Sequence, residues 1–363
     1  MQKKPVSILF ICPYPTGESP SQRFRFEQYF ELLRKQPYQI EVQTFWSAKA
    51  WSALYKEGHV IQKIFGLLGG YCRRFFMLSR LQRFDFVFIH REAAPLGPPI
   101  WEWIAAKILK RKIIYDFDDA IWLPNTSEEN RWVAWIKWHT KVSSICRWSY
   151  KVSCGNHFLC EYARRFNSQV IYNPTTIDTE SLHNPHVYPA REARSKVVIG
   201  WTGSHSTLAY LSLIKNVLHR LESEYNNLEI IIIANKQPDL GLKTVRFIPW
   251  NKNQEGEDLM KIDIGIMPLS DDIWSRGKCG FKALQYLALG IPTIASPVGV
   301  NTDIIEHGKN GYLCTTDEEW FLAFQQLIAN EKIRHAMGQH GQRFVQEHYS
   351  VVSNSTNVLR LFA

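Results

Sequence analysis

The sequence has no paired cysteines, no long apolar run and no short repeat, and each absence removes a class of protein. Its seven cysteines are odd in number, scattered and without a C-x-x-C pair, which argues against a disulfide framework and against a structural zinc site. No apolar run approaches the length of a membrane-spanning helix, and the run VSILFIC near the N-terminus is too short for a signal peptide core. We therefore expect a reduced, cytoplasmic protein.

Acidic residues are scarce in the first half of the chain. Residues 1–180 contain 25 Lys and Arg against 16 Asp and Glu, whereas the remaining residues contain 18 of each. The whole net charge of +9 therefore belongs to the first half, which also holds nine of the 13 tryptophans. A basic surface can attract nucleic acid or an anionic membrane. No nucleic-acid-binding module is recognisable, so we expect no nucleic-acid partner.

The segment from Lys56 to Arg83 concentrates this basic character. It contains six basic residues and one acidic residue among many large apolar ones, a composition typical of surface helices that lie on an anionic membrane. The protein would then be peripheral on the inner face of the cell membrane. In the alternative interpretation the basic residues stay in water and the apolar residues face the protein core. These apolar residues are Ile61, Ile64, Phe65, Leu67 and Leu68.

Short apolar runs alternate with longer helical patterns along the whole chain, which predicts an α/β fold with parallel sheets wound by helices. The polar, proline-containing stretch SLHNPHVYPAREARSK interrupts this alternation before it restarts at VVIGWTG. We predict two Rossmann-like doubly wound domains facing a cleft, residues 1–180 and 181–340. Residues 341–363 are predicted to be a C-terminal helix that packs back on the first domain.

Ligands of such sheets bind where the strands end, beside the N-termini of the helices that follow. One strand end is the stretch IGWTGSHST, in which Gly203 and Ser204 precede a predicted helix. Glycine lets backbone N–H groups approach an oxyanion closely, so both residues are candidates for binding a diphosphate. The stretch matches neither the Walker pattern nor G-x-G-x-x-G. A plain structural turn is the alternative interpretation.

A second candidate is the stretch GKCGFKALQYLALGIPTIAS, residues 277–296. Lys278 is expected at the N-terminal edge of a helix, where a lysine opposes the helix dipole unless an anion is bound. From Lys278 to Gln285 is about 10 Å along a helix axis, which suits a nucleoside diphosphate from its phosphates to its ribose. Gln285 would then bind sugar hydroxyls as donor and acceptor. The alternative is a surface lysine and a solvated glutamine.

The run from Asp263 to Leu313 resembles the C-terminal nucleotide-sugar domain of the retaining glycosyltransferases of family four, enzymes with the GT-B fold. Gly290 and Pro292 match the family's small-Gly-x-Pro step, and Gly299, Asp303, Ile304 and Ile305 correspond to its G-x-x-[ED]-[IL]-[IV] turn, with one more residue between the glycine and the acid. The stretches VIYNPTTID and RFVQEHYS look like the family's end of the first domain and start of the final helix. The resemblance implies transfer of a sugar, with retention, from a nucleotide diphosphate sugar to an acceptor hydroxyl. A role in surface-glycan or lipid-linked saccharide synthesis is implied as well.

The chain departs from the family at its donor site. The two glutamates that the family uses at the donor sugar and at the ribose fall on Gly277 and Gln285. The arginine and lysine that bind the family's diphosphate fall near Trp201 and Ser206. Neither carboxylate and neither cation is therefore present at its usual position.

Positive charge for the diphosphate is then expected from Lys278, helped by Lys282 or Arg276, with no metal ion required. By the resemblance, Gly17 in the first strand-to-helix loop approaches the diphosphate, and Trp250 lies where the family binds the base. The residues predicted to bind the nucleotide sugar are Gly17, Gly203, Ser204, Trp250, Lys278, Phe281, Lys282 and Gln285.

The stretch IIYDFDDAIW supplies three carboxylates after an apolar strand. By the resemblance, Asp118 and Asp119 face the acceptor and the donor sugar, where a carboxylate can orient a hydroxyl or accept its proton. An alternative is a magnesium-dependent phosphohydrolase of the haloacid dehalogenase type using Asp116 and Asp118. A further alternative is a non-catalytic homologue that only binds sugar nucleotide. The residues predicted to line the acceptor side are Arg23, Arg25, Arg91 and Glu92.

Overall fold

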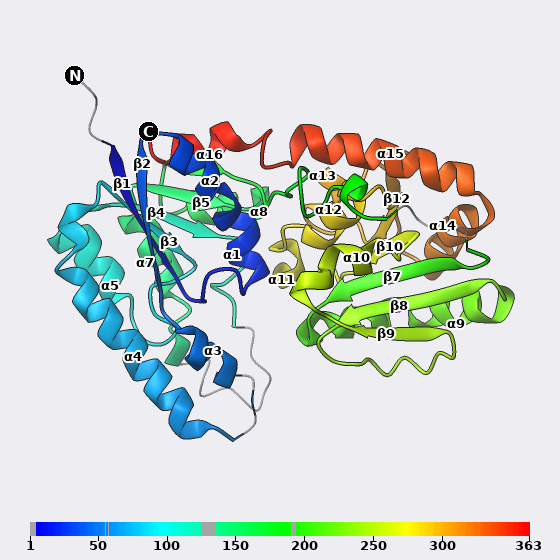
Figure 1. Cartoon of the computed structure of the whole chain (residues 1–363), viewed down its shortest axis with the longest axis horizontal. Helices are drawn as coiled ribbons and strands as arrows, with labels where there is room; N and C mark the ends of the chain where they lie inside the picture. Colours follow the sequence, from blue (N-terminus) through cyan, green and yellow to red (C-terminus); the bar gives the residue numbers. More distant parts are fainter. Residues whose placement is uncertain (1–4, 55, 57, 125–135, 190–193) are drawn as a thin grey trace. The chain divides into compact units, whose positions relative to one another are not determined.

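The computed structural model describes residues 5–54, 56, 58–124, 136–189 and 194–363. The chain forms two compact units: unit 1 comprises Met1–Thr175 with Asn354–Ala363, and unit 2 comprises Thr176–Ser353. Each unit contains a six-stranded parallel sheet wound with helices (Figure 1). The predicted α/β class is therefore confirmed.

The limits of the units differ from the predicted ranges most at the C-terminal end of the chain. Helix α15 (Glu331–His348) belongs to unit 2, and α16 (Ser355–Leu361) belongs to unit 1. Helix α15 packs closely on unit 2 at Gly338. A Cβ atom at this position would lie only 2.0 Å from the carbonyl oxygen of Gly290, so only glycine allows this close approach. Beyond α16, the ring of Phe362 packs into the sheet of unit 1.

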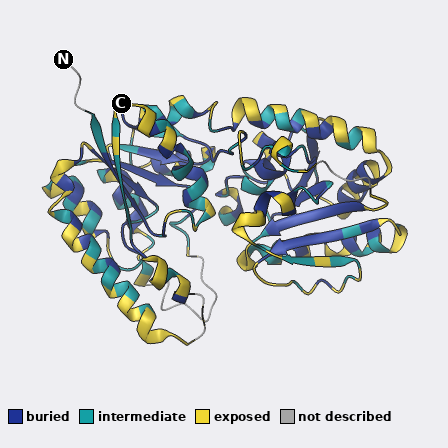
Figure 2. Ribbon diagram, in the orientation of Figure 1, coloured by how far each residue is buried: buried dark blue, intermediate teal, exposed yellow. Residues whose placement is uncertain are grey.

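The sheet of unit 1 has the strand order β2-β1-β3-β4-β5-β6, and every ladder is parallel. Its central strands read as unbroken apolar runs because both faces are covered, as the dark blue strands of Figure 2 show. The strands are β1 (Val6–Cys12), β2 (Tyr38–Thr44), β3 (Phe86–His90), β4 (Lys112–Phe117), β5 (Lys151–Cys154) and β6 (Val170–Tyr172).

The first helical stretch of unit 1 is broken at Phe26. Phe26 leaves the helical region, with φ of −144°, and its ring stacks on Phe10 of β1 at a centroid distance of 5.5 Å. The described helical segments of unit 1 before α16 are α1 (Pro20–Arg25), η1 (Glu27–Tyr29), α2 (Phe30–Lys35), α3 (Ala48–Leu54), α4 (Val60–Leu78), η2 (Leu81–Arg83), α5 (Ile100–Trp103), the π-helical η3 (Ile104–Ile108), α7 (Lys141–Trp148) and α8 (His157–Arg164).

The sheet of unit 2 has the strand order β12-β11-β10-β7-β8-β9 and is again parallel throughout. Its strands are β7 (Val197–Gly203), β8 (Leu228–Ala234), β9 (Val245–Pro249), β10 (Ile264–Met267), β11 (Thr293–Ala295) and β12 (Gly311–Leu313). Its described helical segments before α15 are η5 (Pro185–Val187), η6 (His205–Ile214), α9 (Lys215–Glu224), η7 (Lys252–Gln254), α10 (Glu255–Leu259), α11 (Ile273–Arg276), α12 (Phe281–Ala288), α13 (Asn301–Ile304) and α14 (Asp317–Ala329).

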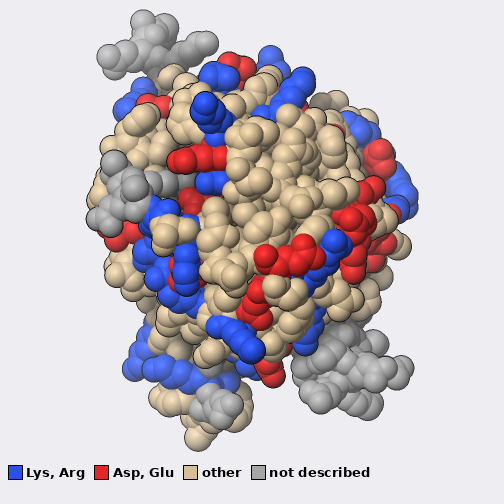
Figure 3. Space-filling model, turned by 90° about the vertical axis from the view of Figure 1, so that its right-hand side faces the viewer, with Lys and Arg blue, Asp and Glu red and all other residues tan. Residues whose placement is uncertain are grey.

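Residues 181–363, most of which belong to unit 2, carry no net charge. Figure 3 looks onto the side on which β7, β8, β9 and α9 lie in Figure 1, and basic and acidic side chains are intermixed there around an uncharged region. Among the described helices, none combines the length and the apolar character needed to cross a membrane.

Candidate functional site

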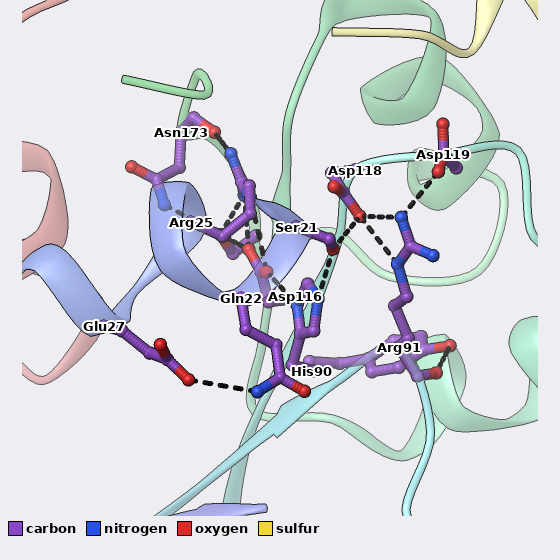
Figure 4. A network of polar contacts seen from close by, with 12 residues as sticks. Ser21, Gln22, Arg25, Glu27, His90, Arg91, Asp116, Asp118, Asp119 and Asn173 are labelled. Atoms are coloured by element: carbon purple, nitrogen blue, oxygen red, sulfur yellow. Dashed lines mark hydrogen bonds and ion pairs between the residues drawn. The ribbon is translucent and has the colours of Figure 1, made fainter. Parts of the chain in front are cut away.

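A buried chain of polar side chains crosses the ends of β3 and β4 in unit 1 (Figure 4). The parallel register pairs His90 with Asp116, and His90 Nδ1 lies 2.8 Å from Asp116 Oδ2. On the other side of the ring, His90 Nε2 lies 2.7 Å from the hydroxyl oxygen of Ser21 on α1. An ionised carboxylate can only accept, so His90 carries a proton on Nδ1 toward Asp116.

Asp116 is held as a buried anion by three neighbours. Arg25 forms an ion pair with it, and Ser153 donates a hydrogen bond of 2.6 Å to Asp116 Oδ1. Burial opposes ionisation, but the charge of Arg25 and the hydrogen bond from His90 outweigh it and hold the pKa of Asp116 well below its usual range. Arg25 itself is buried and also donates to the carbonyl of Asn173. Asp116 therefore anchors the ring of His90 and is closed off from water.

The two predicted catalytic carboxylates are joined by Arg91. Its guanidinium lies 2.7 Å from Asp118 Oδ1 and 2.5 Å from Asp119 Oδ2, and Ser21 Oγ also donates to Asp118 at 3.0 Å. Burial raises the pKa of Asp118, but Arg91 outweighs it and the net shift is downward. All three side chains of this cluster keep some exposure, between 12% and 24%. The cluster thus presents ionised carboxylates to solvent beside a fixed cation.

The backbone of Arg91 explains how it reaches both aspartates. Arg91 has a φ of 60°, which a non-glycine residue seldom adopts. Its N–H donates to the Asp116 carbonyl at 2.7 Å, and its own carbonyl accepts from Tyr115 Oη at 2.8 Å. These two bonds fix the turn after β3 and aim the guanidinium along the end of β4.

The remaining residues predicted for unit 1 have local partners. Glu92 pairs with Lys141 at 2.6 Å, and the Arg23 guanidinium lies 4.8 Å from the ring centroid of Phe24. Gly17, at φ of +80°, donates its N–H to Glu27 Oε2 at 2.8 Å. The structure thus brings Arg91, Asp118 and Asp119 together, while Arg25 turns inward.

In unit 2 the two predicted lysines lie over aromatic rings. Lys278 sits between α11 and α12, half-buried, with Nζ 5.6 Å from the ring centroid of Trp274 and 5.8 Å from that of Tyr210. Lys282, in the first turn of α12, has Nζ 5.3 Å from the ring of Trp201. The faces of aromatic rings attract cations. Both ammonium groups are therefore held in place without being sealed from water.

Gly203 ends β7 beneath the Trp201 ring. A Cβ atom there would lie 2.5 Å from the ring and 2.8 Å from Thr207 Oγ1, so any side chain would displace these neighbours. Ser204 is exposed, and its hydroxyl lies 2.8 Å from that of Ser206 without capping η6. The turn therefore leaves its backbone near the surface of unit 2.

Gln285 faces the interior of unit 2. It is buried, and its Nε2 lies 3.1 Å from Glu255 Oε1 and 3.1 Å from His183 Nε2. Trp250 is half-buried against the apolar cluster that includes Tyr286, and Phe281 packs on a neighbouring cluster. Since α12 begins only at Phe281, Lys278 precedes the helix and does not form part of its first turn.

Several residues of these networks were not singled out from the sequence. In unit 1 they are Ser21, Ser153 and Asn173 as well as His90, and in unit 2 they are His183 and Glu255. His90 could have been found because it ends an apolar strand of a parallel sheet, the edge at which ligands bind. In the described part of the chain, no three His, Cys, Asp or Glu side chains gather in a way that could hold a metal ion.

Two parallel sheets with polar clusters at their strand ends define a protein of the α/β class with the GT-B fold. A glycosyltransferase from Rickettsia africae superposes with a TM-score of 0.69 at 11% identity, covering 99% of this chain and 98% of that one. Sucrose-phosphate synthase from Thermosynechococcus elongatus gives 0.67 at 12% identity, with 98% of both chains covered. The HepE protein of Anabaena, solved with UDP, gives 0.63 at 14% identity, with 98% and 99% covered.

Sequence comparison finds a family match for part of the chain. Residues 196–330, within unit 2, match the family described as glycosyl transferases group 1. Over 72 residues the chain is 33% identical to N-acetyl-alpha-D-glucosaminyl L-malate synthase of Bacillus anthracis. That stretch is 19% of this chain and 19% of the relative, so the match spans about a fifth of its length.

Proposed function

We propose that the protein is a glycosyltransferase that moves a sugar, with retention, from a nucleotide diphosphate sugar to an acceptor hydroxyl. The observation that carries this proposal is the match of residues 196–330 to glycosyl transferases group 1, in a chain with the GT-B fold. Its acceptor would belong to surface-glycan or lipid-linked saccharide synthesis.

In this proposal unit 2 binds the donor through its lysines. Negative charge develops on the leaving diphosphate as the glycosidic bond breaks, so fixed positive charge accelerates the reaction. Lys278 and Lys282 are held over aromatic rings, and the N–H groups of Gly203 and Ser204 lie at the end of β7. These four residues would bind the diphosphate, with Gln285 and Trp250 nearer the nucleoside and Phe281 packed beneath.

Unit 1 would supply the acceptor side. Asp118 and Asp119 are partly exposed and both pair with Arg91, and this arginine outweighs burial so that the pKa of Asp118 is lowered. Either carboxylate can accept a hydrogen bond from an acceptor hydroxyl and take its proton as the new bond forms. Attack from the face of the leaving phosphate gives retention without a covalent sugar–enzyme intermediate.

Uridine nucleotides are the first donors to test. The Anabaena HepE protein was solved with UDP and with UDP-glucose, and the Staphylococcus aureus TarM protein with UDP and alpha-GlcNAc-glycerol. These ligands belong to those proteins, but both proteins share the fold that this chain adopts. A thermal-shift screen should include the other common nucleoside diphosphates, because a ligand of the folded state raises stability in proportion to its affinity.

Lys278→Ala should weaken nucleoside diphosphate binding at least tenfold, about 1.4 kcal/mol, because it removes a charge beside the diphosphate. Calorimetry in the presence of a chelator measures this, and Lys278→Arg should recover part of the affinity. The exposed Lys332 on α15 offers the matched control, and Lys332→Ala should bind as wild type. Equal affinity of the Lys278→Ala variant and wild type would remove Lys278 from the donor site.

Two alternatives predict different outcomes. A phosphohydrolase working through Asp116 would lose magnesium-dependent phosphate release in the Asp116→Asn variant. The structure argues against this alternative, because a nucleophile must reach its substrate and Asp116 is buried with both carboxylate oxygens hydrogen-bonded. A binding-only homologue would take up nucleotide sugars but release no nucleoside diphosphate from any donor. Turnover of a donor panel separates this homologue from the transferase.

A further inference from the structure

Helix α4 presents large apolar side chains to solvent. Those at positions 61, 64, 65, 68, 75 and 76 are each between 51% and 70% exposed, and Cys72 between them is exposed as well. Because they recur at intervals of three and four residues, they form one stripe about 22 Å long. This apolar stripe consists of Ile61, Ile64, Phe65, Leu68, Cys72, Phe75 and Phe76.

The opposite face of α4 is packed so closely that the helix cannot turn its stripe inward. A Cβ atom at Gly66 would lie 2.7 Å from the Cβ of Ala50, and one at Gly70 would lie 2.4 Å from the ring of Phe45. One turn further, the buried Arg74 donates to the carbonyl of Ala93 at 2.6 Å and to other backbone oxygens. Glycine and a bonded arginine therefore face the core, and the large apolar residues face outward. Figure 2 colours much of α4 as exposed.

The interpretation that the apolar residues of this segment face the core is therefore wrong for most of them. Leu67 packs against the apolar cluster around Phe45. Ile61, Ile64, Phe65 and Leu68, in contrast, are exposed. These four apolar side chains are therefore not part of the core of unit 1, and their apolar character needs another explanation.

The surroundings of the stripe are basic. Apart from the buried Arg74, the helix Val60–Leu78 contains Lys63 and Arg73 and no acidic residue, and Lys56 and Arg83, near its two ends, are exposed. Residues 1–180 as a whole carry the entire excess of positive charge. Two copies meeting through this surface would bring like charges together, whereas an anionic surface would be attracted to it.

We propose that the apolar stripe of α4 docks the protein on an anionic lipid bilayer. An interfacial helix buries its apolar face at the boundary of headgroups and acyl chains, while basic residues beside it attract anionic lipid. The stripe provides the first element and the charge of unit 1 the second. Helix α5 adds the exposed Trp103, a residue type favoured at membrane interfaces, and its Trp101 packs on the same cluster as Tyr71 of α4.

Cys72 gives a direct probe of this docking. All seven cysteines lie in the described residues, and Cys72 alone among them is exposed, so a thiol-reactive, polarity-sensitive dye labels the centre of the stripe. Vesicles of phosphatidylcholine with phosphatidylglycerol should shift the emission of the dye to shorter wavelength. Vesicles of phosphatidylcholine alone should shift it several-fold less, and 0.5 M salt should weaken the response because it screens the charges.

Unlabelled protein tests the stripe itself by flotation with the same vesicles. Phe65→Gln combined with Phe76→Gln should lower the partition coefficient at least tenfold, with the melting temperature retained because both side chains are exposed. The matched control is Leu322→Gln with Val352→Gln, which changes two exposed apolar residues of unit 2 and should leave partitioning unchanged.

The proposal is overturned if wild-type protein does not bind the anionic vesicles, or if the stripe variant binds them as wild type does. It is also overturned if light scattering finds a dimer that the stripe variant dissociates, since a second copy would then cover the stripe. Vesicle binding does not depend on nucleotide or sugar, so its failure leaves the proposed sugar transfer intact.

Discussion

The charged residues of the two units are arranged in opposite ways. In unit 1, Arg25 and His90 are buried and both bond to the buried Asp116. In unit 2, Lys278 and Lys282 are half-buried over aromatic rings. A buried ion pair holds a single geometry and is costly to break, while a half-buried ammonium can meet an anion from solution. On the proposed function, unit 1 would hold reacting groups in fixed positions, and the lysines of unit 2 would bind an anion from solution.

Breaking the buried pair of unit 1 should have the largest effect on stability. Arg25→Met leaves the buried carboxylate of Asp116 without the guanidinium that pairs with it, which should cost about 3–5 kcal/mol of unfolding free energy. Urea unfolding followed by circular dichroism measures the loss. The control Arg276→Ala removes an exposed ion pair with Asp271 in unit 2 and should change stability little. Similar losses in both variants would contradict the contrast between the units.

Separating binding from turnover would sharpen the same comparison. Asp118→Asn should reduce sugar transfer about a hundredfold, because an amide cannot take a proton from the acceptor. Affinity for nucleoside diphosphate, assigned to unit 2, should stay within about twofold of wild type, since the substitution adds no new charge contact there. The exposed Glu31 of α2 supplies the control Glu31→Gln. Unchanged turnover in Asp118→Asn would show that this carboxylate is not part of the reaction.

A second carboxylate beside the buried Glu255 should destabilise the interior of unit 2. Gln285→Glu would put a second carboxylate about 3 Å from Glu255, and we expect a loss of about 2 kcal/mol near pH 8 that shrinks in mild acid as the site takes up a proton. The exposed glutamine at position 326 on α14 provides the control Gln326→Glu. A variant as stable as wild type at pH 8 would mean that position 285 tolerates the acid.

Acid should destabilise unit 1 through Asp116. Its pKa is lowered in the folded state, so its contribution to stability is complete above the unfolded value of about 4 and declines as pH falls toward the folded value. The loss between pH 5 and pH 3 should be about 1 kcal/mol from this group. Asp116→Asn should be less stable at neutral pH but lose less on acidification. An equal slope in both proteins would argue against the lowered pKa.

The sequence predicted the sheets well because buried parallel strands are visible as apolar runs. The apolar runs VSILFIC and LEIIIIA form the buried strands β1 and β8. The sequence pattern did not reveal where the helices break. The turn at Phe26 depends on a ring contact with Phe10, a residue of another element that local pattern does not report.

The candidate site could be found only as a set of loops. The rule that ligands bind at strand ends pointed to the segment around Gly203, and the family resemblance pointed to Asp118 and Asp119. Side-chain direction is decided by tertiary partners, so pattern alone could not show that Arg25 turns inward to Asp116 or that Gln285 turns toward Glu255. Periodicity gives a face of α4 but not the side on which the core lies, so the sequence alone left both interpretations of its apolar residues open.

The anomeric configuration of the first product tests the central claim most directly. Nuclear magnetic resonance can follow a nucleotide α-sugar incubated with the protein, an acceptor or water, and a chelator, and it can observe the product before the anomers interconvert. The proposed transferase should release nucleoside diphosphate and form the α-anomer first. Formation of the β-anomer first would contradict retention, and no release from any donor would contradict transfer itself.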